Sequence, residues 1–423
     1  MARLASIGAV KVFNNRAYRI YTQGNFISLI GTWVQRVATG WLVWELTGSG
    51  AWLGIIAAAE LLPSIVAGPL GGAMADRMDR FQLIRTAQIL QAFQAFLLGT
   101  LALYGLADIW LLFALGVFLG VVTSVNQPAR LSMVRNLVRT EDLPVAIAIN
   151  SVLWNAARFV GPVVAGVLIV FLDIGWAFIV NGLSFVAFLI ALQKLRNDIP
   201  RAPAVTGGRV LPQIVEGFQY VRRHQGLGPL IALLLMGSVF VRPFAELLPG
   251  FADAVFGRGA DGLAMLTSAT GVGAVIAGIW MSQVAKLQGL TNLALHSLVA
   301  MAIAMFLLGA TDYFWLGLVA TAMAGCFMLV NGVAAQSLIQ YACAPQMLGR
   351  VLSLYGLSAR AGPAIGALLM GAASEWFGLR IPVVAGGAIC ILAYLWALKR
   401  QRSIAEALGE GASSAPEQPR TSP

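Results

Sequence analysis

Six ionisable side chains lie inside long apolar stretches of this 423-residue chain. They are Arg36, Glu60, Arg158, Arg242, Glu246 and Arg360. A charged side chain costs at least ~2.5 kcal/mol near the centre of a membrane-spanning helix, so it pairs with an opposite charge, binds a ligand or carries a proton. These residues therefore predict charge-based chemistry within a membrane.

Depth and spacing predict two ion pairs among the six. Arg36 and Glu60 lie about 6 Å and about 3 Å outward of the centres of successive apolar stretches, which allows them to pair. Arg242 and Glu246 are four residues apart, on one face of a helix, and can also pair. The two carboxyls are the candidate proton-coupling sites, Glu60 first and Glu246 second, because a carboxyl away from water favours its protonated form.

Two arginines, Arg158 and Arg360, have no acid left to pair with. They either bind backbone carbonyls freed by Pro162 and Pro363, or form a cationic wall that suits an anionic compound. Trp154, one helical turn from Arg158, would add an aromatic face for a planar ligand. The candidate residues of a substrate cavity are therefore Arg36, Trp154, Arg158, Arg242 and Arg360.

The composition places these residues in lipid. Hydrophobic residues make up 59% of the chain and charged residues only 11%, with a mean hydropathy of +0.80, whereas soluble domains carry about a quarter charged residues. The net charge of +10 therefore does not indicate a nucleic-acid partner. The three cysteines fit neither a disulfide framework nor a zinc site, and no nucleotide or metal motif is present. We expect no enzyme activity, no metal and no cofactor.

Twelve apolar stretches are long enough to span a membrane as helices. They cover residues 20–44, 51–73, 82–105, 109–128, 145–171 and 174–193, then 229–251, 262–283, 291–310, 314–340, 351–373 and 381–398. The prediction is an all-α membrane protein with a six-helix bundle in 1–193, a cytoplasmic linker with an interfacial helix in 194–228, a second six-helix bundle in 229–400 and a disordered tail in 401–423.

The distribution of positive charge predicts the orientation. The two ends and every second loop hold 22 of the 28 Lys and Arg residues, and the alternate loops hold two. Because cytoplasmic loops are enriched in positive charge, both termini are predicted to be cytoplasmic. Seven tryptophans lie at the opposite ends of the stretches, where aromatic rings favour the membrane interface.

An internal repeat relates the two halves. A shift of 205 residues aligns eight identities in 34 positions, including Trp110 with Trp315 and Asn126 with Asn331. The shift superimposes the fourth span on the tenth in the same orientation, as in parallel repeats whose interface holds a cavity near the midplane. We expect the two asparagines to form hydrogen bonds between helices.

The loop after the second span reads GGAMADRMDR. This loop resembles the signature Gly-x-Leu-Ala-Asp-Arg-x-Gly-Arg of the major facilitator superfamily. It departs from the signature in Met74 and Asp79, so the turn after Arg77 is expected to differ. The resemblance implies a gating motif made of Gly72, Asp76, Arg77 and Arg80.

Two further segments combine an arginine with a Gly-Pro pair. ARFVGPVVAG in the fifth span is similar to the Gly-Pro motif of antiporters in the superfamily, and ARAGPAIGAL lies in the eleventh span. The small residues permit close approach of helices, so the segments indicate either a packing device or antiport. The helix-packing candidates are Gly161, Pro162, Gly166, Gly362 and Pro363.

The wider pattern, including RPFAELLPGFAD and LGRVLSLYG, resembles the exporter branch of the superfamily that includes enterobactin-type siderophore and macrolide efflux proteins. The resemblance implies export, but it does not identify the substrate. We expect a monomer in the bacterial inner membrane that exports a small compound, coupled to protons. The residues above favour a partly aromatic substrate, which is anionic if Arg158 and Arg360 bind it. The expected partners of the protein are that substrate, protons and membrane lipid. An importer, a non-transporting sensor or assembly factor, and a lipid flippase share the same topology.

A reporter fused after Arg402 tests the topology. We expect the fusion to be active only as a cytoplasmic reporter, because the positive charges hold both ends on that side. A reporter that is active only outside the cytoplasm would overturn the orientation.

Overall fold

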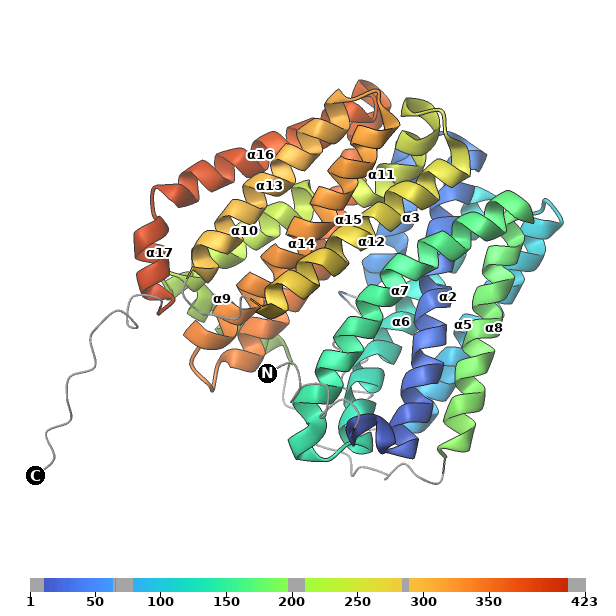
Figure 1. Ribbon diagram of the computed structural model, residues 1–423, viewed down its shortest axis with the longest axis horizontal. Helices are drawn as coiled ribbons and strands as arrows, with labels where there is room; N and C mark the ends of the chain where they lie inside the picture. Colours follow the sequence, from blue (N-terminus) through green and yellow to red (C-terminus); the bar gives the residue numbers. More distant parts are fainter. Residues whose placement is uncertain (1–10, 64, 66–78, 197–209, 284–288, 410–423) are drawn as a thin grey trace, which may run out of the picture.

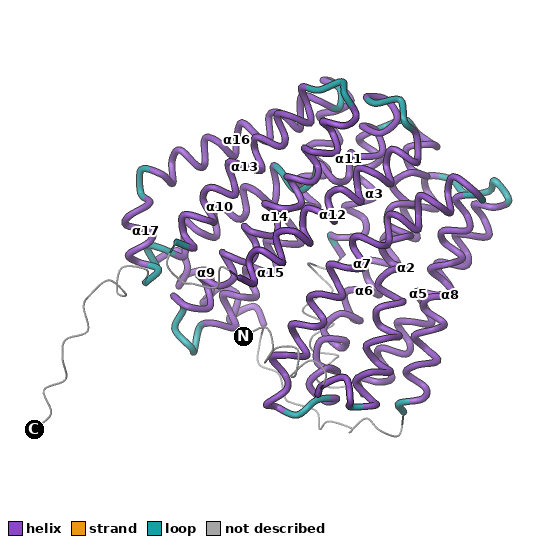
Figure 2. The backbone as a smooth tube through the Cα atoms, viewed as in Figure 1, coloured by secondary structure: helices purple, strands orange, loops and turns teal. Residues whose placement is uncertain are grey.

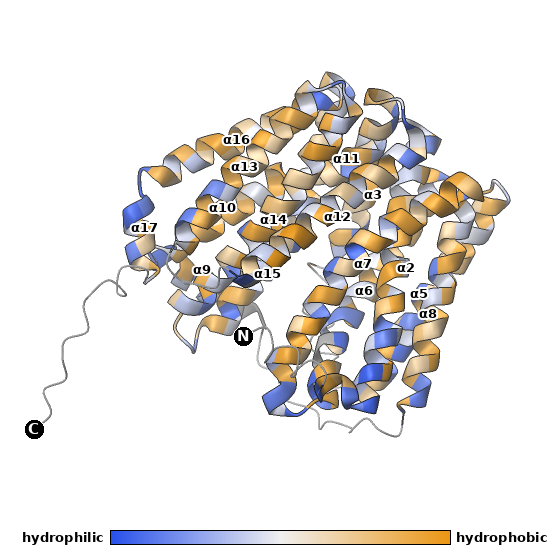
Figure 3. Ribbon diagram, in the orientation of Figure 1, coloured by the Kyte–Doolittle hydropathy of each residue, from blue (hydrophilic) through white to orange (hydrophobic). Residues whose placement is uncertain are grey.

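The computed structural model describes residues 11–63, 65, 79–196, 210–283 and 289–409 (Figure 1). Within these ranges the chain forms helices and connecting loops, with no β-strand (Figure 2). Apolar residues run along most of the helices, and hydrophilic residues gather at the lower ends of α2, α5 and α8 in the view of Figure 3. This pattern agrees with an all-α protein whose solvent is mostly lipid.

The helices of the first half are α2 (Arg16–Thr47), α3 (Gly50–Leu61), α5 (Arg80–Leu103), α6 (Ile109–Leu137), the short 3₁₀ turn Thr140–Asp142, α7 (Leu143–Phe171) and α8 (Ile174–Lys194). Those that follow are α9 (Val210–Arg223), α10 (Leu227–Phe240), α11 (Phe244–Gly250), a π turn (Phe251–Val255), α12 (Gly259–Gln283), α13 (Leu290–Ala310), α14 (Phe314–Ala342), α15 (Leu348–Phe377), α16 (Arg380–Leu398) and α17 (Gln401–Ala407).

Nine helical segments of the described residues are long and apolar enough to cross a membrane. The helices α2 and α15 are also long enough, with 32 and 30 residues, but they carry charged side chains along their length. The described part of α3 has 12 residues and is apolar. The described residues of the expected spans are thus mostly helical, while a count of exactly twelve spans stays a prediction.

Local sequence signals set the starts of several helices. Asn15 accepts hydrogen bonds from the N–H groups of Ala17 and Tyr18 at 2.9 and 3.2 Å and so begins α2. Asp108 begins α6 in the same way. The helix α2 ends at Gly48, whose φ of 58° is a left-handed conformation that favours glycine.

Amide side chains join the helices inside the first bundle. Gln35 of α2 donates to Gln94 of α5 at 3.0 Å, and Asn181 of α8 donates to Gln35 at 2.6 Å. In α6, Asn126 donates to Gln91 of α5 at 3.1 Å. Buried amides of this kind bind helices together where lipid gives no hydrophobic drive for association.

The aligned asparagines make corresponding contacts. Asn331 of α14 donates to the carbonyl of Ala294 and to the hydroxyl of Ser297 in α13, at 2.9 and 3.1 Å. Asn126 likewise joins α6 to α5, the preceding long helix of its own half. The prediction that both asparagines form interhelical hydrogen bonds is confirmed.

The apolar cores reveal how the two bundles meet. The largest cluster of buried apolar residues draws on both halves of the chain. Two smaller clusters are each confined to one half, within residues 12–195 and 221–408, and lie toward the predicted cytoplasmic ends of the helices. The bundles therefore share a core toward one end and have separate cores toward the other, and in Figure 1 their lower ends diverge.

Small residues bring α3 of the first bundle against α15 of the second. A Cβ added at Gly54 would overlap the carbonyl of Ala367, and one added at Gly371 would lie 2.5 Å from the carbonyl of Gly50. The backbones approach this closely only because these positions lack side chains. The contact lies in the part of each helix that is predicted to face outward.

The expected disorder from residue 401 onward is wrong for Gln401–Ala407, which form α17. Ile404 and Leu408 are buried, and both pack against Gly226 at the start of α10. Their spacing of four places them on one helical face, enough to anchor a short helix. Residues 410–423 lie outside the described residues.

Substitutions in α12 test the close packing of α12 on α14. A Cβ at Gly273 would overlap the carbonyl of Ala322, whereas one at Gly278 would meet nothing within 4 Å. We expect Gly273→Ala to lower the free energy of unfolding by about 1–3 kcal/mol. The matched variant Gly278→Ala should be neutral or stabilising by up to about 1 kcal/mol. Equal unfolding temperatures for the two purified variants would contradict this packing.

Candidate functional site

An ion pair joins the two bundles. The guanidinium of Arg36 in α2 binds the carboxylate of Glu246 in α11. The side chains are 38% and 20% exposed, so the pair is only partly shielded from solvent. The predicted pairs, Arg36 with Glu60 and Arg242 with Glu246, are wrong as ion pairs within the described residues. Sequence gives the depth of a residue along its helix, but not which helix of the other bundle it faces.

Glu60 belongs to the same electrostatic cluster without an ion-pair partner in the described chain. Its carboxyl interacts with the charges of both Arg36 and Glu246. The Cγ atom of Glu60 would lie 3.7 Å from a Cβ placed at Gly116, so the side chain runs along a glycine of α6. Arg36 thus has one carboxylate bound in the other bundle and a second nearby in its own.

Trp33 connects the cluster to Arg158. Its ring lies under two guanidinium groups, with the Cζ atom of Arg36 5.7 Å and that of Arg158 5.6 Å from the ring centroid. Trp154, which is 41% exposed, meets Trp33 edge-on with centroids 6.2 Å apart. Arg158 therefore stacks on Trp33, while Trp154 extends the aromatic surface.

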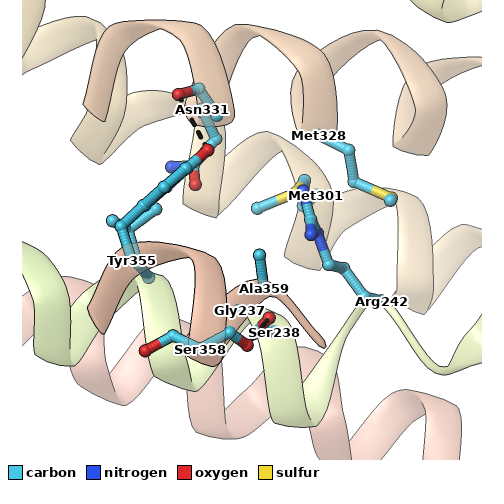
Figure 4. A pocket seen from close by; sticks show the side chains of 11 residues that line it. Gly237, Ser238, Arg242, Met301, Met328, Asn331, Tyr355, Ser358 and Ala359 are labelled. Atoms are coloured by element: carbon cyan, nitrogen blue, oxygen red, sulfur yellow. Dashed lines mark hydrogen bonds between the residues drawn. The ribbon is translucent and has the colours of Figure 1, made fainter. Parts of the chain in front are cut away.

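Arg242 lines a small cavity inside the second bundle (Figure 4). The cavity lies among α10, α13, α14 and α15, and its volume of about 20 Å³ holds one or two water molecules. Tyr355 lies across it from Arg242, and the two groups interact electrostatically. Arg158 also lies within electrostatic reach of Arg242.

Arg360 is separate from this cluster. It is half-buried in α15, and within the described ranges it has neither a hydrogen bond nor an ion pair. Charge interactions link Arg158 to Arg36, Arg242 and Glu246, but none links it to Arg360. The structure therefore brings together four of the five predicted cavity residues and leaves Arg360 apart.

The Gly-Pro segments are packing sites in this conformation. Gly161 faces Trp33 in the same bundle, Gly166 faces Ala264 of α12, and Gly362 faces Ser238 of α10. Pro162 and Pro363 lie within continuous helices. The small residue Gly271 of α12 meets the backbone of α7 at Phe159. The fifth span therefore packs on the eighth.

The predicted gating loop is only partly visible. Gly72, Asp76 and Arg77 lie outside the described residues. Arg80 is the first residue of α5, and its guanidinium donates to Asn136 of α6 at 3.3 Å. Asp79 caps α5 by accepting from the N–H of Phe81 at 2.9 Å. Arg80 thus contacts a helix of its own bundle.

Polar contacts close the bundles at the predicted outer end. Trp44 Nε1 donates to Asp253 at 2.9 Å. The hydroxyl of Ser49 and the N–H of Ala51 donate to Glu375 at 2.7 and 3.0 Å, so a carboxylate of α15 caps the start of α3. All three contacts cross from one bundle to the other.

Residues 7–420 match a family described as transmembrane secretion effectors. The chain belongs to this family, within the major facilitator superfamily. It is thus an integral membrane transporter of the superfamily type.

Relatives with assigned functions are distant but match over most of their length. The staphyloferrin A transporter of Staphylococcus aureus is 23% identical over 90% of this chain and 96% of its own. The macrolide efflux protein A of Streptococcus pyogenes is 24% identical, with 90% and 95% covered. The enterobactin exporter of Shigella flexneri is 26% identical, with 84% of each chain covered.

Solved structures agree on the fold. A transporter of the POT family, solved with 5-aminolevulinic acid, matches with a TM-score of 0.75 at 13% identity, covering 92% of this chain and 97% of the other. A bacterial homologue of the lysosomal transporter Spinster, solved in an inward-facing and unoccupied conformation, matches with a TM-score of 0.70 at 16% identity, covering 92% and 97%.

Two site residues were missed by sequence reasoning. Trp33 precedes Arg36 by three residues, a spacing that places both on one helical face, so a signal was present. Tyr355 lies five residues before Arg360 and offers no such signal. Its position opposite Arg242 depends on how α15 packs against α10.

A double-mutant cycle tests the ion pair between the bundles. Arg36→Gln and Glu246→Gln should each lower the free energy of unfolding, and the double variant should lose less than the sum, with a coupling of about 1–3 kcal/mol. The more exposed pair Arg380–Asp312 serves as control, with an expected coupling of ~0–1 kcal/mol. Additive losses at Arg36 and Glu246 would show that the pair contributes nothing.

Proposed function

We propose that this chain is a secondary active transporter that exports a small, partly aromatic compound with an anionic group, by alternating access and in exchange for protons. The observation that carries the proposal is the ion pair between Arg36 and Glu246, which links the bundles in the middle of the protein. The relatives that move siderophores and macrolides support export.

The packing supports an inward-facing state. The bundles share one core and three polar contacts toward the ends predicted to be outside. Toward the predicted cytoplasmic ends their cores are separate. In this proposal, rocking of one bundle against the other breaks the outer contacts and brings the two cytoplasmic cores together.

The direction of proton movement favours Glu246 over Glu60 as the proton carrier. When the outer side opens, α2 and α11 part and Glu246 loses Arg36. An unpaired carboxylate of low exposure is costly, so Glu246 takes a proton from outside. When the inward-facing state returns, Arg36 rebinds Glu246 and the proton leaves toward the cytoplasm. This cycle moves protons inward, as export by exchange requires.

In this scheme Glu60 pairs with Arg36 in the opposite conformation from Glu246. It has no ion-pair partner in the described inward-facing arrangement and gains Arg36 when the outer side opens. A proton carried by Glu60 would therefore move outward, which cannot drive export. We infer that Glu60 is not the carrier and receives Arg36 after Glu246 releases it, although sequence alone favours Glu60 as the proton site.

The balance of charge supports an anionic substrate. Arg36, Arg158 and Arg242 carry three positive charges near the two carboxylates, which leaves one positive charge in excess. Trp33 and Trp154 provide an aromatic surface beside Arg158. An aromatic anion would offset the excess charge and stack on these rings.

Transport by inverted and right-side-out vesicles tests direction and charge. The probes are 4-hydroxybenzenesulfonate, an aromatic anion, and phenyltrimethylammonium, an aromatic cation of similar size. We expect inverted vesicles with an acidic interior to accumulate the anion above transporter-free vesicles, and the cation much less. Accumulation only by right-side-out vesicles would identify an importer, and preference for the cation would refute the assignment of charge.

Two carboxyl variants test the proton carrier with the same anionic probe. Glu246→Gln should abolish accumulation driven by the proton gradient while retaining exchange of probe across the membrane, because exchange needs no proton release. Glu60→Gln should keep gradient-driven accumulation at a reduced rate. If Glu246→Gln still accumulates the probe with normal pH dependence, and Glu60→Gln does not, then Glu60 is the carrier.

A further inference from the structure

The cavity inside the second bundle has an uncompensated charge. Arg242 is the one charged residue among the eleven described residues that line it. Its sequence neighbour Glu246 is bound to Arg36, and no carboxylate in the described chain lies within ion-pair distance of Arg242. A half-buried guanidinium without a counter-charge is costly, so the cavity favours an anion.

The donors around the cavity suit one small anion. The guanidinium of Arg242 makes no hydrogen bond within the described part of the protein, so its N–H groups are free to bind. The hydroxyl of Tyr355 donates to the carbonyl of Gly332 at 3.4 Å, which is long for a hydroxyl donor. Figure 4 shows Arg242 and Tyr355 on opposite sides of the cavity. An anion between them would receive hydrogen bonds from both.

Two other polar side chains of the lining already donate hydrogen bonds within the protein. Ser238 donates to the carbonyl of Ser358 at 3.0 Å, and the amide of Asn331 donates to residues of α13. Met301 and Met328 complete the wall with flexible thioether side chains, which offer no strong hydrogen-bond donor. The volume of about 20 Å³ admits a chloride ion or one carboxylate group, but no aromatic ring.

We propose that the cavity between Arg242 and Tyr355 is a binding site for a single small anion, either free chloride or the carboxylate of a transported compound. Binding of the anion does not depend on the proposed export. Only its role as the anchor of a substrate carboxylate rests on that function. The inference assigns to the second bundle an anion subsite that is distinct from the aromatic surface at Trp33 in the first.

The test measures the unfolding temperature of the purified full-length protein during titration with sodium chloride or sodium formate. Sodium methanesulfonate, whose anion has no carboxylate and whose tetrahedral head is too bulky for the cavity, keeps the ionic strength constant. A ligand that binds only the folded state raises the unfolding temperature in a saturable manner. We expect such a rise in the wild type, its loss in Arg242→Gln and its retention in the control Arg360→Gln, an arginine of α15 that does not line the cavity.

Tyr355→Phe provides a second variant that keeps the ring and removes one donor. Its half-saturating anion concentration should rise about tenfold, the effect of losing one hydrogen bond to a charged group. A response to chloride alone identifies a halide site, and a stronger response to formate identifies a carboxylate anchor. No saturable rise in the wild type, an unchanged rise in Arg242→Gln, or an unchanged midpoint in Tyr355→Phe would overturn the assignment. Because no transport is measured, failure here leaves the export proposal standing, and failure of export leaves this result standing.

Discussion

The charge of Arg36 inside a membrane-spanning helix is offset by a carboxylate of the other bundle. This ion pair joins α2 to α11. It also leaves two charged side chains, Glu60 and Arg242, without the ion-pair partners that their positions in the sequence suggest. Glu60 lies beside Arg36 without pairing to it, and Arg242 lies without Glu246. The unpaired state of Arg242 and the proposed proton exchange both depend on this one pairing.

Small residues make up much of the remaining contact between the bundles, and they bring the helices close enough for this pair to form. Gly54 and Gly371 let α3 and α15 approach backbone to backbone, and Gly166 lets α7 pack closely on the side chain of Ala264 in α12. Because lipid gives no hydrophobic drive for helix association, such close packing and a few polar contacts must supply it. The same contacts are confined to one end, so the interface can open there without disrupting either bundle.

The two bundles have different interiors. In the first, Gln35, Gln91 and Gln94 form hydrogen-bonded links between α2, α5, α6 and α8. In the second, apolar side chains and small residues dominate, and the small cavity lies beside Arg242. Hydrogen bonds between amides therefore join four helices of the first bundle, whereas the second bundle contains a small cavity lined by one charged residue.

Sequence alone determined that this protein lies in lipid, where its helices are along the chain and which charged residues lie within the membrane. These properties depend on composition, hydropathy and loop charge, which are local, so Arg36, Glu60, Arg158, Arg242 and Glu246 were identified before any contact was known. The resemblance in the loop before Arg80 also placed the chain in its superfamily. The repeat likewise predicted that Asn126 and Asn331 form hydrogen bonds between helices.

Only the tertiary structure decided which charges meet. Depth along a helix follows from residue number, but the direction in which a side chain points depends on how each helix is rotated and on which neighbour it packs against. Arg36 and Glu60 have matching depths, yet Arg36 turns toward Glu246, 210 residues away in sequence. The position of Trp33 between two arginines and that of Tyr355 opposite Arg242 were likewise decided by the tertiary structure. Contacts between helices far apart in the chain are set by packing.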